Sequence, residues 1–405
     1  MIKSSLMHEF NHPILWFFIL TAMVWLYRGR RALAAVHSIP KIIPHPYAPS
    51  EDTQDPLVTV IVPAKNEEKN IAACVTALLH QDYPNLQIIV ANDNSTDQTE
   101  AILRPLATPE IPLEKNGFHA RNFTPRMAYF NCPATPHGWT GKNYAIHTAL
   151  SKAQGKWFLF TDADTRHDPH SISSALEHAR SRDISFLTLL PRCLAESFFE
   201  HLIQPLAMGY LGLWFPMEKV NQPESKKYFA NGQYLLIERK LYEKIGGHDQ
   251  VRSEFLEDFA LMKKAKQTGA RVQCAFGTAV YGTRMYHSLA GIWTGWRRIY
   301  LHAFRSQPLT LLTKYACILL FSVFPFALFF PLIPLALANP RTYGFTLGLS
   351  FPIVLFILLT SWRTYGMVQA KKRYAFLHPV GSLILAMIML DAFWMALSKQ
   401  KTTWR

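Results

Sequence analysis

Asp162 and Asp164 stand at the end of the apolar stretch that starts at Trp157, and only Ala163 separates them. In an open α/β sheet, ligands bind beyond the carboxyl ends of the strands. Carboxylate oxygens there can hold a divalent cation together with substrate phosphates. The spacing therefore favours a metal-assisted diphosphate site. An acidic surface turn is the alternative.

Two earlier segments are expected to place polar residues at the same sheet edge. Leu57–Val62 is a continuous apolar, β-branched run, which is typical of a buried parallel strand. Leu86–Ala91 is a second such strand, and Ser95 or Thr96 after it can cap the next helix. Strand–helix alternation at this spacing predicts a doubly wound sheet. No G-x-G-x-x-G follows the first strand, which disfavours an ordinary dinucleotide-binding domain.

A further polar segment, His137–Asn143, precedes the aspartate pair. It contains two glycines and places Lys142 at a predicted helix start. A lysine and a helix N-terminus both suit a phosphate. A turn with an exposed lysine is the alternative.

An acidic pair, Glu257 and Asp258, falls in the first turn of a predicted helix that begins near Phe255. Acidic residues there are often partners of the helix dipole. In a sugar transfer, however, a carboxylate must remove a proton from the acceptor hydroxyl. Upstream, a short helix is expected to stop at Gly246. His248 beside it is expected to be a solvated loop residue, and a position near the acceptor is the alternative.

Composition favours a membrane partner over nucleic acid. The 405 residues carry a net charge of +14, and many lysines and arginines flank long apolar runs. Five cysteines are scattered without a C-x-x-C pair, which argues against a zinc site or a disulfide framework and fits a reducing compartment.

The C-terminal third contains three apolar runs that are long enough to cross a bilayer: Tyr315–Ala338, Tyr343–Trp362 and Leu377–Leu397. Prolines predict a bend or break in the first run. Asp391 is the lone acid in these runs, and we expect it to face another helix, an acceptor path or the headgroup zone.

The N-terminal apolar run, Pro13–Tyr27, predicts a short membrane anchor, with an interfacial helix as the alternative. Arg28 and two further arginines follow it, and the loop 363–376 is also basic, so both should be cytoplasmic. A fourth span would then place the basic tail, Lys399 to Arg405, outside, against the charge rule, unless the last span is re-entrant. Residues 291–307 have the composition of an interfacial amphipathic helix, with a partly buried helix as the alternative. Phe198–Phe215 could line an acceptor channel, face the bilayer or be an ordinary core helix.

These features divide the chain into an anchor helix, a proline-rich linker, an α/β catalytic domain, an interfacial helix and a membrane region with three spans. The predicted boundaries are, in that order, 1–36, 37–56, 57–290, 291–312 and 313–405.

The ordered set of motifs resembles the family-2 inverting glycosyltransferases with a GT-A fold, over about residues 57–300. It consists of Pro63-Ala64-Lys65-Asn66-Glu67, Asn92-Asp93-Asn94-Ser95, Gly141-Lys142, Asp162-Ala163-Asp164, Gly246-Gly247 and Glu257-Asp258. Gly138–Lys142, Arg284-Met285-Tyr286 and Gly295-Trp296 look like the membrane glycosyltransferases of hopanoid and carotenoid biosynthesis. Two positions depart from the family pattern. Asn92 replaces the first aspartate of a common pair, and the Q-x-x-R-W motif of processive synthases is missing.

The resemblance implies a role for each site residue. Asp258 is the implied general base, with Glu257 second. Asp162 and Asp164 would bind Mg²⁺ or Mn²⁺. The implied nucleotide-sugar contacts are Pro63, Ala64, Asn66, Glu67, Asp93, Lys142 and Asp162. Direct in-line attack would invert the anomeric centre without a covalent intermediate.

The sequence thus predicts a multi-pass protein of the inner cell membrane with a cytoplasmic catalytic domain. It would move a sugar from a nucleotide donor, UDP-linked, to a lipid-soluble, hopanoid- or carotenoid-like acceptor. The alternatives are transfer to a polyprenyl phosphate, polysaccharide synthesis, and a catalytically silent nucleotide-sugar-binding membrane component. No nucleic-acid partner is expected, and no particular oligomeric state is predicted.

Overall fold

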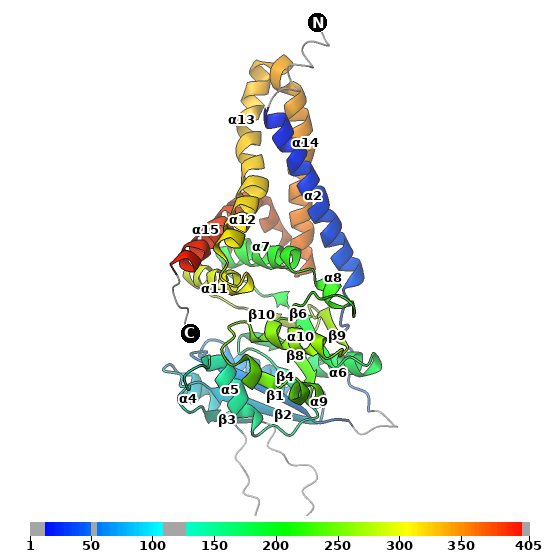
Figure 1. The fold of residues 1–405 in the computed structure, drawn as a ribbon, viewed down its shortest axis with the longest axis vertical. Coiled ribbons are helices and arrows are strands. Elements are labelled where there is room, and N and C mark those ends of the chain that lie inside the picture. Colours follow the sequence, from blue (N-terminus) through cyan, green and yellow to red (C-terminus); the bar gives the residue numbers. More distant parts are fainter. Residues whose placement is uncertain (1–12, 50–54, 108–126, 399–405) are drawn as a thin grey trace, which may run out of the picture. The chain divides into compact units, whose positions relative to one another are not determined.

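The computed structural model describes residues 13–49, 55–107 and 127–398. They form two compact units, an α/β unit and a helical unit (Figure 1). The α/β unit consists of the described parts of Ile39–Leu194 and Phe215–Met285. The helical unit consists of those of Met1–Ser38, Ala195–Trp214 and Tyr286–Thr402. The basic tail from Lys399 lies outside the described residues, so its position stays a prediction.

A mixed seven-stranded sheet forms the centre of the α/β unit, in the order β3-β2-β1-β4-β8-β6-β9. Strands β1, β2, β3 and β4 are parallel, β8 is antiparallel to both of its neighbours, and β9 is parallel to β6. The strands are β1 Val58–Ala64, β2 Leu86–Asn92, β3 Met127–Asn131, β4 Trp157–Phe160, β6 Phe186–Leu190, β8 Leu235–Glu238 and β9 Val272–Phe276. The predicted mixed α/β sheet is confirmed.

The predicted meeting of strand ends at one sheet edge is also confirmed, since β2, β1 and β4 are parallel neighbours. Strand β1 runs through Pro63 and Ala64 instead of stopping before them, and Ala64 accepts a hydrogen bond from the Asp93 amide at 2.8 Å. Strand β4 stops at Phe160, before Asp162 and Asp164, and the Thr161 hydroxyl that follows it donates to the Gln233 carbonyl at 2.8 Å.

Helices pack around the sheet of this unit, and the chain enters two of them differently from the prediction. The helices are α3 Ile71–Leu79, α4 Thr99–Leu103, α5 Gly141–Leu150, α6 Ser171–Ser181, α8 Met217–Val220, α9 Arg239–Lys244, η1 Gly247–Val251 and α10 Glu257–Gln267. Neither Ser95 nor Thr96 caps α4, because Asp97 accepts the Thr99 amide instead. Helix α10 begins at Glu257, two residues after the predicted start.

A small second sheet lies next to the aspartate turn, in the order β5-β10-β7. Its strands are β5 Thr165–His167, β7 Arg192–Cys193 and β10 Tyr281–Thr283. Part of the segment predicted as a linker also packs on this unit: Ile39 and Ile42 are buried, and Lys41 forms a parallel bridge with Phe276.

The helical unit contains three helices that are long and apolar enough to cross a membrane, Pro308–Ala338, Pro340–Met367 and Lys372–Leu397. The first contains α12 Pro308–Ile318, a π-helical turn η2 Leu319–Val323 and α13 Phe324–Ala338. The second is α14, and the third joins η3 Lys372–Leu377 to α15 His378–Leu397. The predicted break in the first segment falls at the π-helical turn just before Pro325.

The described part of this unit contains three more helices: α2 Pro13–Ser38, α7 Phe198–Trp214 and α11 Leu289–Ala303. Within the unit, α7 lies across the long helices near one end of α14 (Figure 1). The helix α2 is not among the three candidate spans, so its crossing of a membrane stays a prediction. Asp391 of α15 accepts hydrogen bonds from Trp293 and Arg297 of α11, so it faces another helix, one of the three predicted outcomes.

Candidate functional site

Lys142 is the centre of a charged cluster at the carboxyl end of β4. Its Nζ lies 2.8 Å from Asp162 Oδ1 and 2.8 Å from Glu257 Oε1. The side chain is only 16% exposed. The structure therefore brings together three predicted site residues that are distant in the sequence. In this arrangement Lys142 bridges two carboxylates, a contact that the predicted phosphate role did not include.

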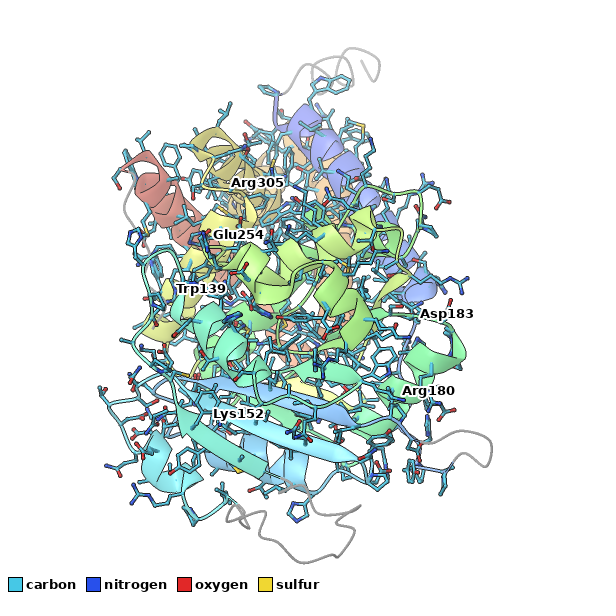
Figure 2. The ribbon with its side chains drawn as sticks, turned by 60° about the horizontal axis from the view of Figure 1, so that its bottom comes forward. Trp139, Lys152, Arg180, Asp183, Glu254 and Arg305 are labelled. Atoms are coloured by element: carbon cyan, nitrogen blue, oxygen red, sulfur yellow. The ribbon has the colours of Figure 1, made fainter. Side chains whose placement is uncertain are left out.

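Helix α5 holds Lys142 in this place. The Thr140 hydroxyl caps the helix by accepting the Asn143 amide at 3.3 Å. The buried Asn143 side chain donates to the carbonyls of Val251 and Glu254, each at 2.9 Å, and lies 3.2 Å from that of Arg252. Trp139 and Glu254, which flank this junction, are labelled in Figure 2. The start of α5 is thus fixed to the loop that leads into α10 and its acidic pair.

Asp258 lies beside the cluster and is held by backbone donors. The Gly232 amide donates to its Oδ2 at 2.7 Å, and the Phe259 amide donates to its Oδ1 at 2.8 Å. A Cβ on Gly232 would lie 3.2–3.4 Å from Asp258, Lys142 and Glu257, so a side chain there would crowd all of them. The absence of a side chain at this position leaves room for the cluster.

The charges of the cluster are unequal, because one ammonium group faces the carboxylates of Asp162, Glu257 and Asp258. Burial, followed by repulsion from Glu257, raises the pKa of Asp258 to about 7, although Lys142 opposes this shift. Burial alone would lower the pKa of Lys142. The attraction of Asp162 and Glu257 outweighs it and holds the pKa of Lys142 well above its ordinary value. A carboxyl group with a pKa near neutrality suits proton transfer.

Asp164 points to different neighbours. The Thr283 hydroxyl donates to its Oδ1 at 3.3 Å, and the Arg284 amide donates to its backbone carbonyl at 3.2 Å. Among the described residues, no group of three or more histidine, cysteine or acidic side chains could hold a metal ion. The binding of a divalent cation by Asp162 and Asp164 stays a prediction. Such a hard cation would take its other ligands from a diphosphate and water.

The loops after β1 and β2 are tied together, as the predicted nucleotide site requires. The Asn66 amide donates to Ser95 Oγ at 2.9 Å, and Asn66 Oδ1 accepts the Thr96 amide at 2.8 Å. The Glu67 amide donates to Thr99 Oγ1. Asn66 has a φ of 55°, a left-handed conformation that this bonding stabilises.

Three other residues predicted to contact the nucleotide sugar, Asp93, Ala64 and Pro63, are buried. Asp93 is 1% exposed and pairs with Lys65 Nζ at 3.0 Å, so it lies beneath the loop surface. Ala64 is buried in β1, and Pro63 is a strand residue beside it. A direct contact of Asp93 with a base or ribose stays a prediction, since in this structure its carboxylate pairs with Lys65.

His248 is buried, so the prediction of a solvated loop residue is wrong. It is 1% exposed, its ring packs 5.0 Å from that of Phe160, and its Nδ1 lies 2.7 Å from the Tyr242 hydroxyl. Burial, and then the charge of Lys142, lower its pKa to about 3, so the ring is neutral. The positioning roles of Asn143 and Gly232 were not predicted from the sequence. The run Gly141-Lys142-Asn143 at a helix start was the only available signal for the first.

Comparison with known proteins now names the domain. Residues 59–246 match the sequence profile described as Glycosyl transferase family 2. This chain contains a glycosyl transferase family 2 domain. The match includes Lys142 and Asp162 and ends before Glu257 and Asp258. The predictions of the family and of a glycosyltransferase enzyme are confirmed.

The glycosyltransferase is similar to two curated proteins called 4,4'-diaponeurosporenoate glycosyltransferase. The one from Staphylococcus haemolyticus is 24% identical over 291 residues, 69% of this chain and 71% of the relative. The one from Staphylococcus aureus is 22% identical over 249 residues. That match spans 60% of each chain.

A solved structure has the same fold over almost the whole chain. It is a mannosyltransferase from Pyrobaculum calidifontis in complex with GDP-Man and Mn²⁺. The TM-score is 0.53, the identity is 17%, and the match covers 96% of this chain and 100% of the other. The fold prediction is confirmed by this likeness as well.

The bonds of Asn143 predict that replacing it will disturb the site from a distance. Asn143→Ala removes the donors shared by the carbonyls at 251, 252 and 254. We expect a loss of about 1–3 kcal/mol in the free energy of unfolding and a fall in kcat of roughly tenfold, because the acidic pair shifts. Thermal unfolding and initial rates measure both. Ser151→Ala at the exposed end of α5 is the control, and equal effects of the two variants would contradict the role of Asn143.

The raised pKa of Asp258 predicts a pH-dependent cost in stability. Between pH about 4 and about 7 the folded protein keeps a proton that the unfolded chain releases. The free energy of unfolding of the wild type should therefore fall as pH rises through this range. Asp258→Asn lacks this dependence. The melting temperature of the variant minus that of the wild type should therefore increase from pH 5 to pH 8. A constant difference would show that Asp258 is not perturbed. Asp249→Asn, at an exposed position, is the control.

Proposed function

We propose that this protein transfers a sugar from a UDP-linked donor to the hydroxyl group of a lipid-soluble acceptor, with inversion at the anomeric carbon. The observation that carries the proposal is Asp258, a buried carboxyl group with its pKa raised to about 7 beside the bridge from Lys142 to Asp162 and Glu257. A base with this pKa can take a proton from a hydroxyl group as the hydroxyl attacks. Glu257 is the second candidate for this role.

The arrangement supports a single displacement. Asp162 and Asp164 lie at the carboxyl end of β4, where substrates bind in open α/β sheets. They would hold Mg²⁺ or Mn²⁺, which would offset the charge of the departing nucleoside diphosphate. The ammonium group of Lys142 lies 2.8 Å from Asp162 and can add a positive charge on the same side. Asp258 then serves the attacking acceptor, so no side-chain nucleophile is needed.

Apolar helices fused to the catalytic domain support a lipid-soluble acceptor. The three candidate spans expose large apolar side chains, including Phe330, Leu337 and Trp394, as expected for contact with lipid tails. The curated relatives are named for 4,4'-diaponeurosporenoate, which supports a hydrophobic, hopanoid- or carotenoid-like substrate. Because that name denotes a carboxylate, it supports the apolar character of the acceptor and not the hydroxyl group, which rests on Asp258 alone. We propose a multi-pass protein of the inner membrane with the glycosyltransferase domain in the cytoplasm, because the basic segments at 28–31 and 371–373 flank apolar helices.

The protonation state of the acceptor distinguishes the alternatives. A hydroxyl group must lose a proton as it attacks, whereas a polyprenyl phosphate, like a carboxylate, is already an anion at neutral pH. A buried base with a raised pKa is useful only in the first case. The environment of Asp258 therefore favours a hydroxyl acceptor over transfer to a polyprenyl phosphate. Synthesis of a polysaccharide would instead give a large, water-soluble product.

We expect Asp258→Asn to lower kcat by about 10²–10⁴-fold, because the base is lost. In the wild type, kcat/KM should rise with pH through about 7 as Asp258 loses its proton. Membranes containing the protein would be incubated with labelled UDP-sugars and GDP-sugars, and the label in the organic extract would be counted. Asp249→Asn is the matched control. Nearly unchanged turnover in Asp258→Asn, with a flat pH profile, would show that the acceptor attacks as an anion.

The aspartate pair predicts a dependence on divalent cations. We expect EDTA to abolish transfer, and Mn²⁺ or Mg²⁺ to restore it. Asp164→Asn should lower turnover by orders of magnitude and raise the Mn²⁺ concentration needed for half-maximal rate, because one carboxylate ligand is lost. Direct titration with Mn²⁺ in the presence of UDP measures the affinity separately. Transfer that persists at full rate in EDTA would contradict the metal site.

A further inference from the structure

Arg28 is a buried cation without an acidic partner. It lies on α2 with 8% of its surface exposed, and its guanidinium makes no ion pair with any of the described residues. The groups that contact the guanidinium are all uncharged. Nη1 donates to Ser322 Oγ at 3.0 Å, and Nη2 lies 3.4 Å from the carbonyl of Cys317. Burial of a charge is costly unless it is paired, so this position favours an anion.

The surroundings of Arg28 are built from three separate segments of the helical unit. The guanidinium lies over the rings of Trp25, at 4.9 Å, and Tyr210, at 5.7 Å. The Tyr210 hydroxyl donates to Ser322 Oγ at 2.6 Å. Ser322 lies in the π-helical turn η2, and such turns are frequent at functional sites. The Ser322 hydroxyl oxygen in this turn therefore accepts hydrogen bonds from both Arg28 and Tyr210 and links the two side chains.

The guanidinium has donors to spare. Arginine carries five N–H groups in a planar fork, and the two hydrogen bonds to Ser322 and Cys317 account for two of them. This fork matches the oxygens of phosphate or carboxylate, which it can bind in pairs. The exposed part of Arg28 thus offers an incomplete set of donors that an oxyanion would complete.

The helices that hold Arg28 and its neighbours have the composition of a membrane interface. Trp25 packs against His378, with ring centroids 5.4 Å apart, and His378 directly follows η3, which begins with the basic residues Lys372 and Arg373. In that segment Lys372 Nζ lies 4.1 Å from the centroid of the Trp362 ring. Tryptophan, tyrosine and basic side chains gather at the headgroup level of bilayers. Basic residues next to apolar helices also attract anionic lipids.

We propose that Arg28, with Tyr210 and Ser322 as its support, binds the phosphate group of an anionic membrane lipid in the helical unit. The site is separate from the glycosyltransferase cluster and does not depend on which sugar or acceptor the enzyme uses. The phosphate can belong to a bulk phospholipid or to a prenyl phosphate, and these two sources give different results in the test.

The test uses the full chain in nanodiscs of phosphatidylcholine, with and without phosphatidylglycerol. The wild type should gain about 3 °C or more in melting temperature when phosphatidylglycerol is added. Arg28→Gln should lose most of this gain. Arg30→Gln, which removes an equal charge from an exposed position of the same helix, should keep it. If Arg28→Gln does not fold, Arg28→Lys replaces it, and less than half of the gain is expected because the fork is lost.

A second set of discs contains a prenyl phosphate in place of phosphatidylglycerol. A gain with the prenyl phosphate alone that depends on Arg28 assigns the site to that lipid, and the oxyanion proposal holds. The proposal fails if neither lipid stabilises the wild type, or if Arg28 and Arg30 variants respond alike. Mass spectrometry of the purified protein checks the result independently. The wild type should retain anionic lipid that Arg28→Lys loses.

Discussion

The ion pairs of Lys142 are the constraint on which the glycosyltransferase site depends. One ammonium group lies 2.8 Å from both Asp162 and Glu257, and Asp258 is close enough to be repelled by Glu257. Carboxylates can be buried together only if cations or donors compensate them. Burial, followed by repulsion from Glu257, raises the pKa of Asp258 to about 7, and the single charge of Lys142 does not cancel this shift. Burial and an excess of carboxylates thus give a group suited to accept a proton.

Backbone donors and one amide side chain hold the charged groups of the site in position. Amides of Gly232 and Phe259 fix both oxygens of Asp258. Asn143 joins the helix that carries Lys142 to the loop before the acidic pair. Rigid donors of this kind cost nothing to reorganise during a reaction. Burying Asp258 costs stability at neutral pH, and the same burial raises its pKa into the range that suits the proposed role as a base.

In the helical unit the same rule about buried charge gives a different outcome. Asp391 receives donors from Trp293 and Arg297, so this acid is compensated within the protein. Arg28 has only hydroxyl, carbonyl and aromatic neighbours among the described residues. One charge therefore joins two helices, whereas the other remains available to an anion from outside the chain.

The sequence by itself determined the elements and the segments that carry the chemistry. Apolar, β-branched runs predicted β1 and β2, and the positions of Asp162 and Lys142 after a strand and at a helix start followed from local patterns. Long apolar runs likewise predicted the three candidate spans. Only the tertiary structure decided that Lys142 contacts two carboxylates, that His248 is buried and that the pKa of Asp258 is raised. These three properties depend on contacts between segments that are distant in the sequence. Local periodicity contains no information about such contacts, since packing and desolvation arise only when the segments meet.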